Sequence, residues 1–189
     1  MKYITKFKQF ESEDISVDLE KLDSLSQTGP SQKQIDDLES KSDLFKLVRS
    51  VTKCQNKDIR ISDSEELTQV VITLPCSSGD IIYICQVRQM VRGSTDYELI
   101  DGKLDIIKTY KSMELYDSDK DTIDNFSKEC VDYGVKFNRI GKQNIDYVNG
   151  WLVRISKSFW GGGKKKLHSD LNLNAISGFL VKLQETFVK

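Results

Sequence analysis

Between residues 67 and 110 apolar and polar residues alternate, and this pattern constrains the fold more than any other feature of the sequence. Residues 68–74, 80–92 and 97–110 repeat with the period of two that places successive side chains on opposite faces of a strand. The turn-forming sequences Ser77-Ser-Gly-Asp80 and Gly93-Ser-Thr-Asp96 separate them. Strands joined by such short connections pair in antiparallel fashion. The middle of the chain therefore predicts an antiparallel sheet.

Helical periodicity precedes the sheet. Ile15, Leu19 and Leu22 form one apolar stripe on an acidic helix expected at about residues 13–26. After a Gly-Pro break, Ser31 is an expected N-cap, and a second helix is expected to run to about Lys53. We therefore predict an N-terminal helical hairpin over residues 1–54, connected to an α+β unit over residues 67–189 and packed with it into one compact body.

The last third predicts further elements. We expect a helix at 120–133, a short strand at 136–140 and a strand at 147–159, followed by a final helix capped by Ser169 or Asp170. Asp101-Gly102 lies inside 97–110 and signals either a hairpin or a bulge, so this segment is one bulged strand or two short ones. The expected fold is α+β, with a mainly antiparallel sheet of about four to five strands and a C-terminal helix packed on it.

The composition argues for a cytoplasmic protein without cofactor or metal. The N-terminus has no apolar signal segment, and no apolar run is long enough to span a membrane. Its four cysteines form no CxxC pair and His168 is the only histidine, so we expect reduced, partly buried thiols. The single alanine beside many Lys, Ile, Asn and Asp residues is typical of an AT-rich genome, as in a low-GC bacterium, mobile element or virus.

Positive charge is concentrated between residues 135 and 168. This stretch has one acid, Asp146, on a chain whose net charge is −1. Its eight positive residues are Lys136, Arg139, Lys142, Arg154, Lys157, Lys164, Lys165 and Lys166. Aromatic residues interleave with them, and both tryptophans lie here: Trp151 alternates with core positions, whereas Trp160 follows the strand end beside three glycines. The eight positive residues and Trp160 are the candidate partner-binding or anion-binding residues.

The basic and aromatic composition allows two kinds of partner. Lysines and exposed aromatic rings contact phosphates and bases in nucleic-acid-binding proteins. Dedicated nucleic-acid-binding domains are usually basic overall, and this chain is not. A protein partner with an acidic surface, or self-association with the acidic helices of this chain, also fits. We therefore expect a non-enzymatic binding or adaptor protein that engages a protein partner through 136–166, with nucleic acid as the alternative.

The predicted order α-β-β-β-α-β resembles the core of the PD-(D/E)xK nucleases. In that family a strand carboxylate and a D/E-x-K motif on the next strand hold a divalent metal, which activates the attacking water. The resemblance would assign this motif to Asp101 and Lys103, with Asp80 among the upstream acids. The chain has no Pro-Asp dipeptide, and Asp101-Gly102 is also a turn signal. Over residues 31–187 the element order also resembles type III secretion chaperones, acidic dimers that bind extended client segments.

Overall fold

The computed structural model describes residues 29–90, 97–140, 150–156, 165–168 and 171–188. Their strands form one seven-stranded sheet in the order β1-β2-β3-β4-β6-β5, with β7 paired to β4. The α+β fold class is confirmed, with more strands than expected. The strands are β1 Ile59–Asp63, β2 Leu67–Cys76, β3 Gly79–Met90, β4 Tyr97–Thr109, β5 Lys136–Ile140, β6 Gly150–Ser156 and β7 Lys165–His168.

All neighbours in the main strand order are antiparallel. β4 is a single strand with a bulge, where Asp101 takes a φ of 54°. Two strands, β6 and β7, share the edge of β4 that faces away from β3. Its later residues pair with β6, and Tyr97–Ile100 pair in parallel with β7.

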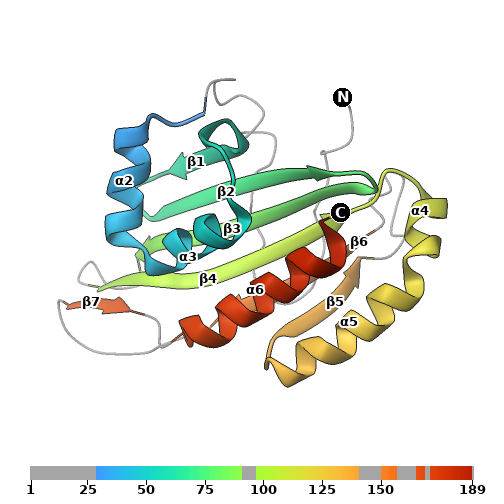
Figure 1. The fold of residues 1–189 in the computed structure, drawn as a ribbon. Coiled ribbons are helices and arrows are strands. Elements are labelled where there is room, and N and C mark those ends of the chain that lie inside the picture. The colour runs from blue at the N-terminus through green and yellow to red at the C-terminus, as the bar shows by residue number, and fades with distance from the viewer. Residues whose placement is uncertain (1–28, 91–96, 141–149, 157–164, 169–170, 189) are drawn as a thin grey trace.

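The helices cover one face of the sheet (Figure 1). They are α2 Gln32–Lys41, α3 Asp43–Thr52, α4 Met113–Ser118, α5 Lys120–Asp132 and α6 Leu173–Phe187, with a short 3-10 helix at Asn56–Asp58. Each of α2 to α6 packs apolar residues into a core shared with the sheet. We call this side of the sheet the helical face. The expected C-terminal helix is α6, and its apolar residues Ile176, Leu180, Leu183 and Phe187 are buried.

Aromatic rings fill the core between α5, α6 and the β5–β6 pair. Phe126 of α5 lies 5.3 Å from Trp151, 5.6 Å from Phe179 and 5.1 Å from Phe187, measured between ring centroids. Trp151 is 0% exposed, which confirms its expected place in the core. These contacts fix α6 against the strands that carry the basic segment.

The single helix predicted after Ser31 is two helices, so this prediction is wrong. Ser31 does form a capping box with Gln34, as expected. Ser42 then adopts an extended conformation (φ −137°, ψ 107°), which ends α2 and caps α3. No apolar residue lies between Leu38 and Leu44, and the break between α2 and α3 falls within this polar stretch.

Other differences involve short elements. β1 and the 3-10 helix occupy the expected connector between residues 54 and 66, and α4 precedes the predicted helix at 120–133. Lys165 and Lys166, expected in a connector, belong to β7. The final helix is capped by Asn172, whose Oδ1 accepts from the Ala175 amide at 3.1 Å. Ser169 and Asp170 lie outside the described residues, as does the helix predicted at 13–26.

The opposite face of the sheet also has an apolar centre. Five residues there are 3–8% exposed, and partly buried Ile82 packs against them. They are Val71 on β2, Ile84 on β3, Ile107 on β4, Leu152 on β6 and Ile140 on β5. We call this side the second face and these six residues the second-face cluster.

Candidate functional site

The β5–β6 pair carries the described part of the basic segment. Lys136 is directly opposite Arg154 in the antiparallel register. Trp151, Val153 and Phe137 belong to the core on the helical face. Because side chains alternate along a strand, Lys136 and Arg154 extend to the second face.

Arg154 and Lys103 meet at one buried carboxylate. Arg154 donates from Nε to Asp105 Oδ1 at 2.8 Å and from its Nη2 to Oδ2 at 3.2 Å. Lys103 Nζ lies 3.1 Å from the same Oδ2, and Asp105 is 3% exposed. Two cations thus contact one carboxylate, and exposed Lys136 lies opposite Arg154 on the next strand. We call Lys103, Lys136 and Arg154 the basic patch.

The predicted binding residues do not all lie on this face. Arg139 pairs with Asp124 of α5. The backbones of Lys165 and Lys166 pair with β4 opposite Tyr97 and Glu98. Lys142, Lys157, Trp160 and Lys164 lie outside the described residues. The structure therefore brings Lys136 and Arg154 together and separates Arg139 from them.

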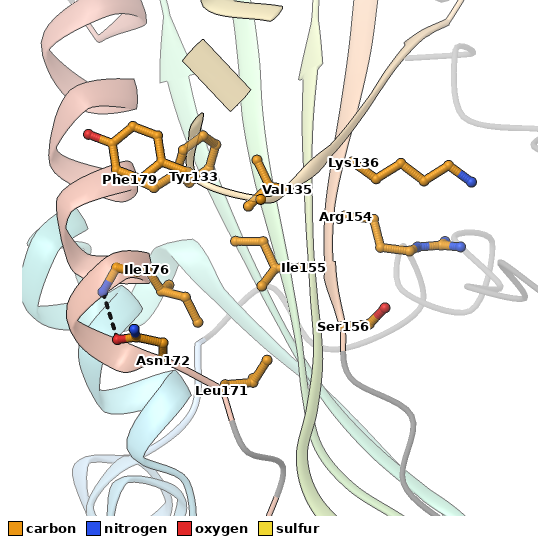
Figure 2. A pocket seen from close by; sticks show the side chains of 12 residues that line it. Tyr133, Val135, Lys136, Arg154, Ile155, Ser156, Leu171, Asn172, Ile176 and Phe179 are labelled. Atoms are coloured by element: carbon orange, nitrogen blue, oxygen red, sulfur yellow. Dashed lines mark hydrogen bonds between the residues drawn. The ribbon is translucent and has the colours of Figure 1, made fainter. Parts of the chain in front are cut away.

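An apolar pocket of about 290 Å³ lies behind the same strands, between them and the first turns of α6. Figure 2 shows Val135, Ile155, Leu171 and Ile176 turned toward the space beside α6, whereas Lys136 and Arg154 extend to the other side of the strands. The described lining residues are Tyr133, Gly134, Val135, Lys136, Arg154, Ile155, Ser156, Leu171, Asn172, Ala175, Ile176 and Phe179. This α6 pocket is thus apolar inside, with the basic patch across the strands.

The size and lining of the α6 pocket limit what it can do. Pockets for drug-sized ligands or cofactors usually measure about 300–1,000 Å³. This pocket lies just below that range, and its volume suits one large side chain. Its described lining has no carboxylate, cysteine or histidine to act as acid, base, nucleophile or metal ligand.

Sequence reasoning found Lys136 and Arg154 but missed the apolar half of this site. Tyr133 ends α5, is 38% exposed, and stacks edge-on against Phe179 with ring centroids 5.5 Å apart. Ala175 and Leu171 come from a distant segment. The only local signal was an aromatic residue directly after a helix, which by itself indicates no pocket.

The residues considered for nuclease chemistry are not brought together. The Asp101 carboxylate accepts from the Asp43 amide at 3.1 Å and from Ser42 Oγ, at the start of α3. Lys103 pairs with Asp105 instead. Asp80 is at the other end of β3 from Gln86, the residue that pairs with Lys103. The six residue steps from Asp80 to Gln86 span roughly 20 Å along the strand, so Asp80 is far from Lys103.

Metal binding and thiol chemistry find little support in the part of the chain that the structure describes. It contains no group of His, Cys, Asp and Glu side chains suited to a metal ion. All four cysteines are free and buried, as expected for reduced thiols. Burial raises the pKa of the Cys54 and Cys76 thiols, and that of Cys130 to about 12, so the reactive thiolate is disfavoured.

Compared with models of known protein families, with curated proteins and with solved structures, the chain matches none. Among the helices that the structure describes, none has the length and apolar character needed to cross a membrane. The assignment of a function therefore rests on the geometry of the site.

Proposed function

We propose that this protein is a non-enzymatic binding protein that engages a segment of another protein at the α6 pocket and the adjoining basic patch. One large apolar side chain of the partner enters the pocket, and acidic residues beside it contact Lys136. The observation that carries the proposal is an apolar pocket of side-chain size directly behind the strands of the basic segment. The cytoplasmic location expected from the sequence belongs to the same proposal.

The physical argument for a protein ligand combines burial with charge. Anchoring residues at protein interfaces are mostly large side chains that enter dry pockets, and they supply most of the binding energy. Complementary charges around such an anchor favour specificity and association rate more than affinity. Lys136 is exposed on edge strand β5, so a segment seated in the pocket can reach it along that edge.

The described residues favour a protein over nucleic acid. Arg154 and Lys103 both contact Asp105, which already neutralises part of their charge. The aromatic rings described on β5 and β6 are Phe137 and Trp151, and both pack into the core rather than offering a surface for bases. A phosphate-binding surface would need more free cations than this patch supplies.

The experiment is a selection from a displayed library of random peptides on the purified full chain. We expect selected peptides to share one large apolar residue flanked by Asp or Glu. Lys136→Glu should weaken their binding at least fivefold at low salt and less at high salt, because counterions screen exposed charges. Lys128→Glu on exposed α5 makes the same charge change away from the site and is the matched control.

Two outcomes would contradict the proposal. Selected peptides without the apolar and acidic pattern, or an equal loss in both variants, would remove the assignment to this surface. Single-stranded and duplex oligonucleotides of about 20 nucleotides serve as a second set of probes, since this length covers one binding-site footprint. Tight, salt-dependent binding of these probes that is lost in Lys136→Glu would favour nucleic acid instead.

A further inference from the structure

No described helix lies over the second-face cluster. Its five buried members are 3–8% exposed. Helices α2 to α6 all pack into the core on the helical face. An antiparallel sheet with one solvated face would carry polar residues there, whereas this face is apolar at its centre. An apolar centre of this kind suits a docked amphipathic segment.

We propose that residues 11–26 dock across the second face as an acidic amphipathic helix. Ile15, Leu19 and Leu22, spaced for one side of a helix, supply the apolar surface that meets the cluster. The proposal concerns contacts within the chain and does not depend on the function proposed for the α6 pocket.

The dimensions of the cluster fit such a helix. Its residues run across five neighbouring strands, from Val71 on β2 to Ile140 on β5. Four steps between strands at about 4.8 Å make a row of about 19 Å. The stretch predicted to be helical, residues 13–26, would be about 21 Å long at 1.5 Å per residue. One helix laid across the strands would therefore cover the row.

The described chain begins at Gly29, at a place from which residues 11–26 could reach the cluster. Gly29 lies against the backbone of Asn56, so closely that a Cβ on Gly29 would be 1.9 Å from the Asn56 carbonyl oxygen. Asn56 opens the 3-10 helix that leads into β1, the strand at the edge of the sheet next to β2. A segment ending at this edge needs only a short connection to reach Val71 and cross toward β5.

Charge complementarity supports the same placement. Residues 11–26 contain one lysine, Lys21, and six acids: Glu11, Glu13, Asp14, Asp18, Glu20 and Asp23. The basic patch borders the cluster on the same face, because Asp105 pairs with Arg154 in the register and Ile107 pairs with Leu152 two residues further along. A helix running from β5 toward β1 would bring its first acids, Glu11 to Asp14, to the end of the cluster beside Arg154.

Cysteine cross-linking in the full chain tests the proposal. Ile82 of the cluster is replaced by cysteine, together with Ile15→Cys, Leu19→Cys or Leu22→Cys. Val17→Cys and Ser24→Cys, on the opposite side of the predicted helix, are the matched controls. We expect an intramolecular disulfide, identified by mass spectrometry, to form at least tenfold faster with one or more of the stripe residues than with either control. The four native cysteines are buried, which limits competing reactions.

A second measurement keeps the test decisive. Ile82→Cys alone is labelled with a thiol reagent, with and without Leu19→Asp/Leu22→Asp. We expect these two charges on the stripe to accelerate labelling at least tenfold, and Val17→Asp/Ser24→Asp to leave the rate unchanged. Equal labelling rates with the stripe charges and with the control charges would mean that another segment, such as 141–149, covers the face. Disulfides between chains rather than within one would assign the cover to a second copy. Either result would overturn the proposal.

Discussion

Lys108 is a buried lysine whose placement opposes folding. It is 0% exposed on β4, and its Nζ is one of three buried side-chain atoms without a hydrogen-bond partner among the described residues, with Tyr110 Oη and Trp151 Nε1. The nearest compensation is the Tyr110 ring, whose centroid lies 4.8 Å from Nζ. A buried, unsatisfied amine opposes folding because it loses its water without a replacement.

Replacing this lysine with an apolar side chain of similar length should therefore stabilise the protein. We expect Lys108→Met to raise the free energy of unfolding by about 1–3 kcal/mol, measured by urea denaturation. Lys111→Met is the control, because the exposed Lys111 amine already contacts the carbonyl oxygens of Cys76 and Ser77. A destabilised Lys108→Met variant would mean that the amine has a partner that offsets its burial.

The difference in stability between wild type and Lys108→Met should depend on pH, because burial also shifts the pKa of Lys108. Loss of solvent lowers the pKa of Lys108, although the nearby Cys76, Asp119 and Asp80 oppose the shift. Between the lowered pKa and the ordinary value of 10.5, the unfolded chain binds the proton and the folded chain does not. The stability of the wild-type protein should therefore rise with pH in this window. The advantage of Lys108→Met should shrink as pH 10.5 is approached from below.

At the scale of elements, α3 depends on a residue of β4. Asp101 accepts hydrogen bonds from the Asp43 amide and Ser42 Oγ, and Ser42 Oγ accepts from the Phe45 amide at 3.0 Å. Asp101 also holds a left-handed conformation, with φ of 54°, which Asp and Asn tolerate better than most residues. One side chain thus joins the break between α2 and α3 to the bulge in β4.

Asp101→Ala removes this cap and puts alanine in an unfavourable conformation. We expect a loss of about 2–4 kcal/mol in the free energy of unfolding, measured by urea denaturation. Asp101→Asn keeps an acceptor oxygen and the tolerated conformation, so it should lose less than half as much. Equal losses would show that the negative charge, rather than the cap, is what matters.

The asparagine variant also separates folding from nuclease chemistry. We expect neither wild type nor Asp101→Asn to cut DNA with Mg²⁺ or Mn²⁺, because Asp101 and Lys103 have different partners. Metal-dependent cleavage by the wild type, lost in a folded Asp101→Asn protein, would establish the nuclease alternative.

Most elements that the sequence predicted are long, although the five-residue β5 was also expected. β2, β3 and β4 are 10, 12 and 13 residues long, and α6 repeats its apolar residues over about four turns. β1 was missed because only Ile59 and Ile61 alternate within five residues, and α4 because six residues carry little periodicity. The pairing of β7 with β4 depends on residues about 68 positions apart, such as Tyr97 and Lys165, which no local pattern reports.

The candidate site was predictable only in part, for the same reason. Lys136 and Arg154 stood out because their charge is visible in the chain. The pocket is formed where Tyr133, Ile155 and Ala175 meet, and each of these residues is unremarkable in its own segment. Whether a cation is free also depends on tertiary contacts, as the pairing of Arg139 with Asp124 shows.

At the scale of the molecule, the two faces of the sheet have different roles in this account. The helical face, over which the helices lie in Figure 1, holds the main core, and the α6 pocket lies at its β5–β6 end. The second face carries the apolar cluster and the basic patch. Because β5 is an edge strand, Lys136 lies where a ligand in the pocket can reach the basic side of the sheet.

Binding at the α6 pocket is tested by the affinity of a selected peptide for a protein whose pocket is filled. Ala175→Trp places an indole in the pocket, whereas Asn174→Trp adds the same side chain one position away, at an exposed site outside the lining. The account predicts a dissociation constant at least tenfold higher for Ala175→Trp, a loss of about 1.4 kcal/mol, and a value within twofold of wild type for Asn174→Trp. Equal affinities for all three proteins, with unchanged melting temperatures, would contradict it.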